Sequence, residues 1–122
     1  MTKLKNFLRS RIASFSYAFQ GIVPVVRRER NMHIHIVAAV AVICAGVYFD
    51  LQAWEWICIT FAIGAVCTAE FFNSAIETLA NVVCKEKNPD IKKVKDIAAA
   101  AVLISAVAAA VVGCIIFVPK IW

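Results

Sequence analysis

The sequence has too few charged residues for a soluble domain. Of its 122 residues, 17% are charged and 62% are hydrophobic. A soluble domain of this size is usually about half apolar, and it needs a polar surface to cover its core. Lipid must therefore solvate much of the chain. The length allows one domain, residues 1–122.

Several motifs that would indicate other functions are also missing. No two of the five cysteines have CxxC spacing, so neither a zinc site nor a disulfide framework is indicated. No glycine-rich phosphate loop is present, which excludes a P-loop or protein-kinase fold. No clean apolar run follows the basic N-terminus, so we expect no cleavable signal peptide. The net charge of +5 lies in two blocks that flank apolar segments, and this favours lipid head groups over nucleic acid.

Residues 3–22 predict an amphipathic helix on the membrane surface, because apolar residues recur at steps of three and four among basic ones. Its apolar face comprises Leu4, Phe7, Leu8, Ile12, Phe15, Phe19 and Ile22. Gly21 and Pro24 predict the end of this helix, and the run Arg27–Arg30 predicts a charged turn or a new helix start. Residues 1–32 therefore form the expected surface helix and turn.

Three apolar segments predict membrane-spanning helices at residues 34–52, 54–83 and 97–118. A short polar loop separates the first two, and residues 84–96 form a charged loop with a turn at 88–90. The predicted fold class is thus an all-α membrane protein with a surface helix and three transmembrane helices. Pro119 is expected to end the third span.

The basic residues predict the orientation of these spans. Seven of the 13 Lys and Arg precede the first span, five lie between Lys85 and Lys95, and only Lys120 follows the last. The positive-inside rule places the N-terminus and the 84–96 loop in the cytoplasm and the C-terminus outside. We expect a multi-pass protein of the cell inner (plasma) membrane.

The second half of the middle span carries a polar stripe. Glu70, Asn73, Glu77 and Asn81 are spaced 3, 4 and 4 residues apart, so they share one narrow face of a helix. Ionisable residues inside a span are costly and usually functional. The alternative is a structural seam in which polar side chains join helices. Two carboxylates exceed what such a seam requires, which favours function.

Other ionisable residues are expected near the same membrane face. Glu29 lies in a basic run, where a solvated ion pair is the simpler explanation. For Asp96, the simpler explanation is that it caps the N-terminus of a helix. Taken with the stripe and Lys95, however, these residues predict a site for a metal–nucleotide complex. Mg²⁺ binds carboxylates and phosphate oxygens, and lysine neutralises a transferring phosphoryl group.

Three segments carry a resemblance to a known family. The stretch Glu70–Glu77 resembles the E-x-x-N-S-A-I-E signature of prokaryotic diacylglycerol kinases, and Lys95–Leu103 resembles their K-D-x-A-x-A-A-V-L segment. Glu29–His35 is similar to the E-x-N-x-x-x-H of the Gram-positive branch, whose members act mainly on undecaprenol. The ending from Phe117 to Trp122 also fits that branch. The resemblance covers nearly the whole chain.

This resemblance implies a homotrimer with active sites between subunits, ATP as co-substrate and Mg²⁺ as cofactor. Glu70 would be the general base on the lipid hydroxyl, with Ala99 also at the lipid substrate, and Glu29 and Glu77 would hold Mg²⁺. The implied nucleotide-binding residues are Tyr17, Glu29, Asn73, Glu77, Asn81, Glu86, Lys95 and Asp96.

The chain departs from the family pattern in two places. The family usually has Asp at the position of Asn81, so cation or nucleotide affinity should be weaker here. Its N-terminal basic contact to the nucleotide falls near Ser10, so Arg9 or Arg11 would replace it.

The predicted function is a membrane lipid kinase with undecaprenol as the favoured substrate. The alternatives are a diacylglycerol kinase and a small non-enzymatic assembly subunit of the membrane. Carboxylates spread over three separate segments argue against the assembly subunit, because joining helices does not require them.

The orientation can be tested by labelling cysteines with a membrane-impermeant reagent applied from outside. A cysteine tag added after Trp122 should react, whereas one added before Thr2 should not. The opposite pattern would contradict the charge-based orientation.

Overall fold

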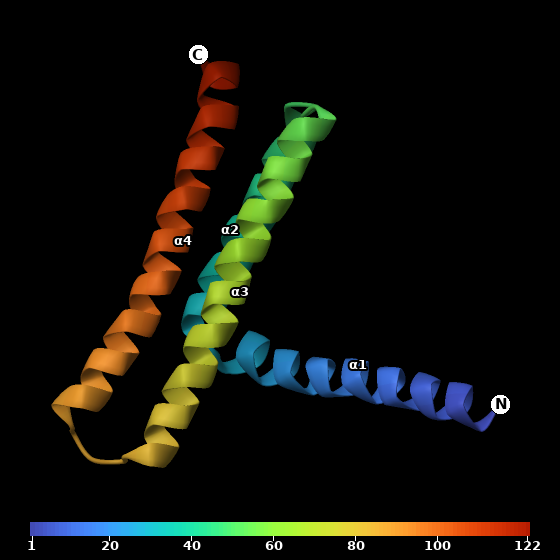
Figure 1. The fold of residues 1–122 in the computed structure, drawn as a ribbon. Coiled ribbons are helices and arrows are strands. Elements are labelled where there is room, and N and C mark those ends of the chain that lie inside the picture. Colours follow the sequence, from blue (N-terminus) through green and yellow to red (C-terminus); the bar gives the residue numbers. More distant parts are fainter.

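A computed structural model describes all residues from Met1 to Trp122. It contains four helices and no strand: α1 (Thr2–Arg28), α2 (Arg30–Tyr48), α3 (Ala53–Val83) and α4 (Pro89–Ile121). Helices α2, α3 and α4 form a bundle, and α1 leads away from one end of it, crosswise to the others (Figure 1). The predicted all-α class is confirmed, and α2, α3 and α4 are each long and apolar enough to cross a membrane.

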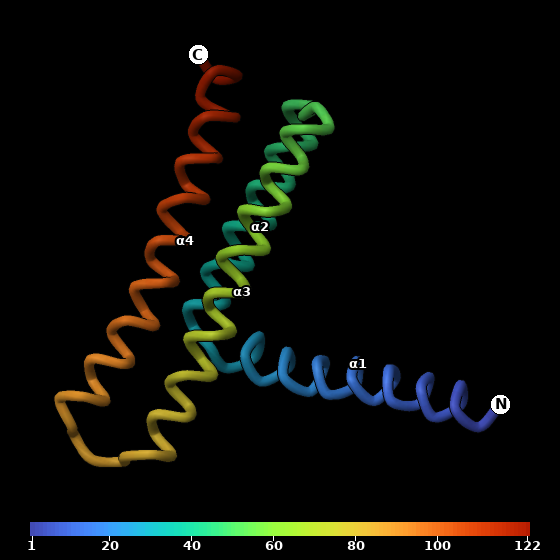
Figure 2. Tube along the Cα trace, in the orientation of Figure 1, coloured from blue at the N-terminus to red at the C-terminus, as the bar shows by residue number.

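The three bundle helices differ in length, and α3, which carries the polar stripe, is one of the two longer helices. α2 has 19 residues, α3 has 31 and α4 has 33. At 1.5 Å per residue they measure about 28, 46 and 50 Å, against a hydrocarbon layer of about 30 Å. α3 and α4 must therefore extend into the head-group region. Their connecting loop lies at the same end of the bundle as α1 (Figure 2).

Helix α1 ends later than the sequence predicts. The expected break at Gly21 and Pro24 is wrong, because the helix continues to Arg28 and only Glu29 adopts extended backbone. No residue of α1 is buried, so water can satisfy the carbonyl that Pro24 leaves without a donor. At the break, the His33 ring donates from Nε2 to the Val26 carbonyl at 2.7 Å. A carbonyl in the last turn of α1 thus gains a donor, which fixes the elbow between α1 and α2.

The turn between α2 and α3 is closed by two backbone bonds. The Leu51 amide donates to the Gly46 carbonyl at 3.1 Å, and the Asp50 amide donates to that of Val47 at 3.3 Å. With Asp50 at φ 53°, this is a Schellman motif with Asp in the position that usually holds glycine. Gln52 then begins α3 in a reciprocal capping box with Glu55.

Helix α4 begins eight residues before the predicted start at 97. The Asn88 side chain accepts from the Asp90 amide at 2.8 Å, and Pro89 occupies the first turn, where its missing N–H costs nothing. The predicted 84–96 loop is therefore reduced to residues 84–88, and Asp96 caps nothing. At the other end, α4 continues past Pro119 to Ile121, again beyond the expected stop.

The apolar core lies at the end of the bundle that holds the α2–α3 turn. Leu51, Ile59 and Ile116 form it, with Trp56 and other partly buried side chains packed against them. At the same end, Lys120 of α4 lies 3.1 Å from the Glu55 carboxylate; the Glu55 side chain is buried and that of Lys120 is 26% exposed. This ion pair joins the start of α3 to the end of α4. Only 12 of the 122 residues are buried in the single chain, so lipid or further copies must cover the rest of its apolar surface.

Gly46 marks a close approach of α2 to α3 that can be tested. A Cβ atom there would lie 2.6 Å from the tip of the Trp56 ring and 3.0 Å from a Leu51 methyl group. Gly46→Ala should therefore lower the unfolding free energy in detergent by roughly 1–3 kcal/mol, the usual cost of overpacking.

The matched control is Gly64→Ala in α3, where the added methyl meets nothing within 4 Å. This variant should be as stable as the parent or slightly more stable, since alanine favours helix. Equal stability of the two variants would show that Trp56 does not pack against α2.

Candidate active site

The polar stripe of α3 runs from the bundle interior to its surface. Glu70 is 1% exposed and Asn73 is 5% exposed, whereas Glu77 is partly buried and Asn81 is exposed. The 11 residue steps from Glu70 to Asn81 cover about 16 Å of helix axis. One face of α3 therefore connects a buried carboxylate to the aqueous end of the bundle.

Glu70 is the most deeply buried charged side chain and faces a histidine. Its Oε2 lies 3.5 Å from Nε2 of His35 on α2, without a hydrogen bond, and no other protein atom donates to this oxygen. A carboxylate oxygen without a donor in such a place is costly. This atom is therefore available to accept a proton from a ligand.

Two further polar atoms beside Glu70 have no partner. The Asn73 amide donates from Nδ2 to Glu77 Oε1 at 3.4 Å, but Asn73 Oδ1 and the Ser74 hydroxyl oxygen are buried without hydrogen bonds. Buried polar atoms of this kind usually have a functional or unobserved partner. The middle of the stripe is thus arranged for a polar ligand.

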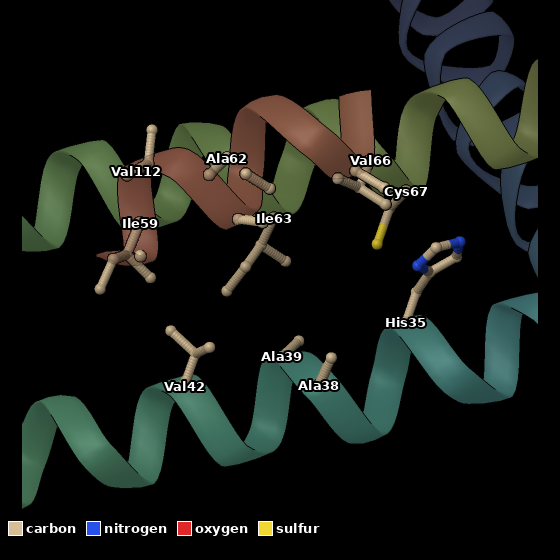
Figure 3. A pocket seen from close by; sticks show the side chains of 14 residues that line it. His35, Ala38, Ala39, Val42, Ile59, Ala62, Ile63, Val66, Cys67 and Val112 are labelled. Carbon is tan, nitrogen blue, oxygen red and sulfur yellow. The ribbon is translucent and has the colours of Figure 1, made fainter. Parts of the chain in front are cut away.

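Two cavities of about 260 Å³ each meet at His35. The first is lined by Asn31, His35, Asn73 and Ala99 together with apolar residues of α2 and α4. The second is almost wholly apolar and extends from His35 and Cys67 past alanines of α2, α3 and α4 (Figure 3). Together they offer a polar end and an apolar extension, which suits a lipid with a single polar group.

A third cavity, of about 640 Å³, lies under the α3–α4 loop and is strongly basic. Lysines line it at positions 85, 87, 92 and 95, together with Asn81 and Glu86. The Lys95 ammonium donates to Asn81 Oδ1 at 2.7 Å, which ties the start of α4 to the end of the stripe. Four lysines around one opening favour an anionic, soluble ligand.

The single chain does not gather every predicted site residue. Tyr17 is 70% exposed on α1, which leads away from the bundle, and Glu29 is the residue between α1 and α2. Asp96 pairs with Lys92 at 2.6 Å, on the exposed surface of α4. No group of three or more His, Cys, Asp and Glu side chains in the chain could hold a metal ion by itself.

Sequence reasoning missed several residues of these cavities, among them His35 and Lys92. His35 belongs to the Glu29–His35 motif, but only the packing of α2 against α3 reveals its contact with Glu70. Lys92 and Asp96 have the i,i+4 spacing of a helical ion pair. That signal could have extended α4 toward residue 89.

These features define a membrane enzyme whose lipid-facing and water-facing cavities lie along one stripe of polar residues. A family model for prokaryotic diacylglycerol kinase matches residues 16–117. The undecaprenol kinase of Bacillus subtilis is 37% identical over 117 residues, covering 96% of this chain and 95% of that protein. A diacylglycerol kinase of Synechocystis is 32% identical over 111 residues, which cover 90% of this chain and 63% of that protein.

The chain belongs to the prokaryotic diacylglycerol kinase family, and it is a membrane-embedded lipid kinase that uses ATP as co-substrate. The prediction of a lipid kinase is confirmed, and the alternative of a non-enzymatic assembly subunit is set aside. The individual roles of the site residues remain predictions.

Proposed function

We propose that this protein transfers the γ-phosphoryl group of ATP to undecaprenol. The observation that carries this proposal is the buried Glu70 oxygen without a donor, on the polar stripe and 3.5 Å from His35, which lines the apolar cavity. The relative from Bacillus subtilis supports undecaprenol as the lipid, since it is similar over nearly the full length of both chains. Diacylglycerol is the second candidate, supported by the family description and the Synechocystis relative.

In the proposed reaction, Glu70 takes the proton of the lipid hydroxyl as general base. The lipid oxygen then forms a bond to the γ-phosphorus, and the bond between that phosphorus and the bridging oxygen of ATP breaks, which releases ADP. Ala99 of α4 lines the cavity that also contains Asn73, and its small side chain leaves room for the lipid head. The apolar extension of Figure 3 would accept the first part of the lipid tail.

The nucleotide is proposed to bind in the basic cavity under the α3–α4 loop. Lys95 would neutralise charge on the phosphates of the nucleotide, and Asn81 would hold Lys95 in place through the bond of 2.7 Å. Glu86 lines the same cavity and is proposed to contact the nucleoside. Asp96 would position Lys92 through their ion pair.

Mg²⁺ is proposed to be held by Glu77 together with Glu29, and the donor set fits this ion. Glu77 offers carboxylate oxygens, and the buried Asn73 Oδ1 beside it has no partner. Mg²⁺ uses one or two protein carboxylates and completes its shell with water and phosphate oxygens, so a larger acidic cluster is not required. The ion would neutralise phosphate charge when bound.

A homotrimer with active sites between subunits is proposed to complete this arrangement. Tyr17 lies on α1, which extends away from its own bundle (Figure 1), and Glu29 follows the end of α1. In the proposed trimer, α1 would contact a neighbouring subunit. The large exposed apolar surface of the bundle supports both lipid contact and self-association. We propose the plasma membrane as its location, with α1 on the cytoplasmic face.

The reaction can be tested with purified protein, labelled ATP and each lipid in separate assays. Undecaprenol should be phosphorylated faster than diacylglycerol, and Glu70→Gln should lower the rate by roughly 10²–10⁴-fold with either lipid. Glutamine keeps the shape of the side chain but cannot take the hydroxyl proton.

Glu55→Gln is the matched control, because Glu55 is also a buried glutamate of α3 but lies at the opposite end, paired with Lys120. This variant should keep the parental rate of transfer. Near-parental transfer by Glu70→Gln would remove Glu70 from the role of base, and no transfer to any lipid by the parent protein would contradict the proposed function.

The metal site can be tested by titrating Mg²⁺ at fixed ATP. Glu29→Gln and Glu77→Gln should each raise the Mg²⁺ concentration for half-maximal activity several-fold, because an amide binds a hard cation more weakly than a carboxylate. Asp50→Asn, in the turn between α2 and α3, should leave it unchanged. An unchanged Mg²⁺ requirement in both glutamine variants would argue against a shared site.

A further inference from the structure

The burial of Glu70 creates a problem for turnover. If Glu70 takes a proton in each cycle, it must release that proton before the next lipid can react. Its side chain is 1% exposed, so water has little direct access to the carboxylate. A second group is needed to carry the proton away.

His35 is the basic side chain that reaches this carboxylate. Its Nε2 lies 3.5 Å from Glu70 Oε2, and its side chain is 17% exposed, compared with 1% for that of Glu70. His35 also lines both cavities that meet at the site, so it is placed between the buried acid and more open space. Histidine is the side chain best suited to gain and lose a proton near neutral pH.

The other groups around Glu70 do not offer this route. The thiol of Cys67 lies at the His35 end of the apolar cavity (Figure 3), and α4 contributes only apolar side chains and Gly113 to the two cavities. Glu77 lies seven residues further along α3, about 10 Å along the helix axis, and accepts a bond from Asn73 instead.

We propose that His35 relays the proton from Glu70 to water after each transfer, a role that rests on the proposed function of Glu70 as base. The O–H bond of protonated Glu70 breaks and an N–H bond forms at Nε2 of the neutral imidazole. The imidazolium then gives one proton to water, and His35 returns to its neutral form. His35 therefore acts through Glu70 as a positioning and relay residue, and it does not contact the lipid oxygen or the phosphorus that react.

The test compares His35→Ala and His35→Gln with the parent in the labelled-ATP assay. Both variants should lower kcat by roughly 10–100-fold, within the range expected for a proton-transfer group. The KM for ATP should change less than about twofold, since His35 does not line the basic cavity proposed for the nucleotide. Added imidazole should restore at least a tenth of the parental kcat to His35→Ala, because the removed ring leaves space beside the cavity.

Two matched controls separate this role from packing. His33→Gln changes the other histidine of α2, which contacts Val26, and should keep the parental kcat. Cys44→Ala removes an exposed thiol of α2 that lines neither cavity, and it should also keep the parental kcat. Imidazole should not restore kcat to Glu70→Gln. Adding His35→Gln to Glu70→Gln should lower kcat no further, because the two residues act in series.

A kcat within about threefold of the parent in both His35 variants would overturn the relay. A loss that imidazole does not restore, with KM raised instead, would also overturn it and assign His35 to substrate packing. If the alanine variant does not fold, the glutamine variant decides through kcat and KM alone. An active parent with an inactive Glu70→Gln would leave the proposed function intact in each of these cases.

Discussion

The hydrocarbon of the bilayer offers no hydrogen-bond partner to a peptide group, and every part of this chain reflects that constraint. The helices are continuous through their apolar segments, and the backbone is interrupted only at three short breaks. At each break, local groups satisfy the exposed backbone atoms. The His33 ring donates to the Val26 carbonyl, and the Leu51 amide donates to the Gly46 carbonyl. The Asn88 side chain accepts from a backbone amide in the first turn of α4.

The same constraint separates the bundle into two chemically different ends. Leu51, Ile59 and Ile116 form a dry core near the α2–α3 turn, whereas the polar stripe of α3 leads toward the α3–α4 loop. Glu70 lies at the inner end of that stripe and faces His35, which lines the apolar cavity. The basic cavity lies at the other end of the stripe, where the Lys95 ammonium donates to Asn81.

Much of the architecture could be predicted from local sequence, but the helix ends were less certain. The number of helices, their class and the bounds of α3 followed from apolar periodicity. Pro24 wrongly predicts the end of α1, because an exposed helix can replace one lost backbone hydrogen bond with a bond to water. The proline by itself does not indicate whether the helix around it is exposed. The charged composition of residues 89–96 predicts a loop, but Asn88 and Pro89 form a strong helix start and α4 begins there.

The sequence by itself determined that the chain spans a membrane, that Glu70, Asn73, Glu77 and Asn81 share one helix face, and which family it belongs to. Only the tertiary structure decided which residues of other helices meet that face. His35 opposes Glu70 and Lys95 bonds to Asn81, while at the far end Lys120 pairs with Glu55 across 65 positions of sequence. Helical periodicity fixes the direction in which a side chain points from its own axis. The rotation and offset of the neighbouring helix depend on packing along its whole length, so the partner cannot be read from spacing.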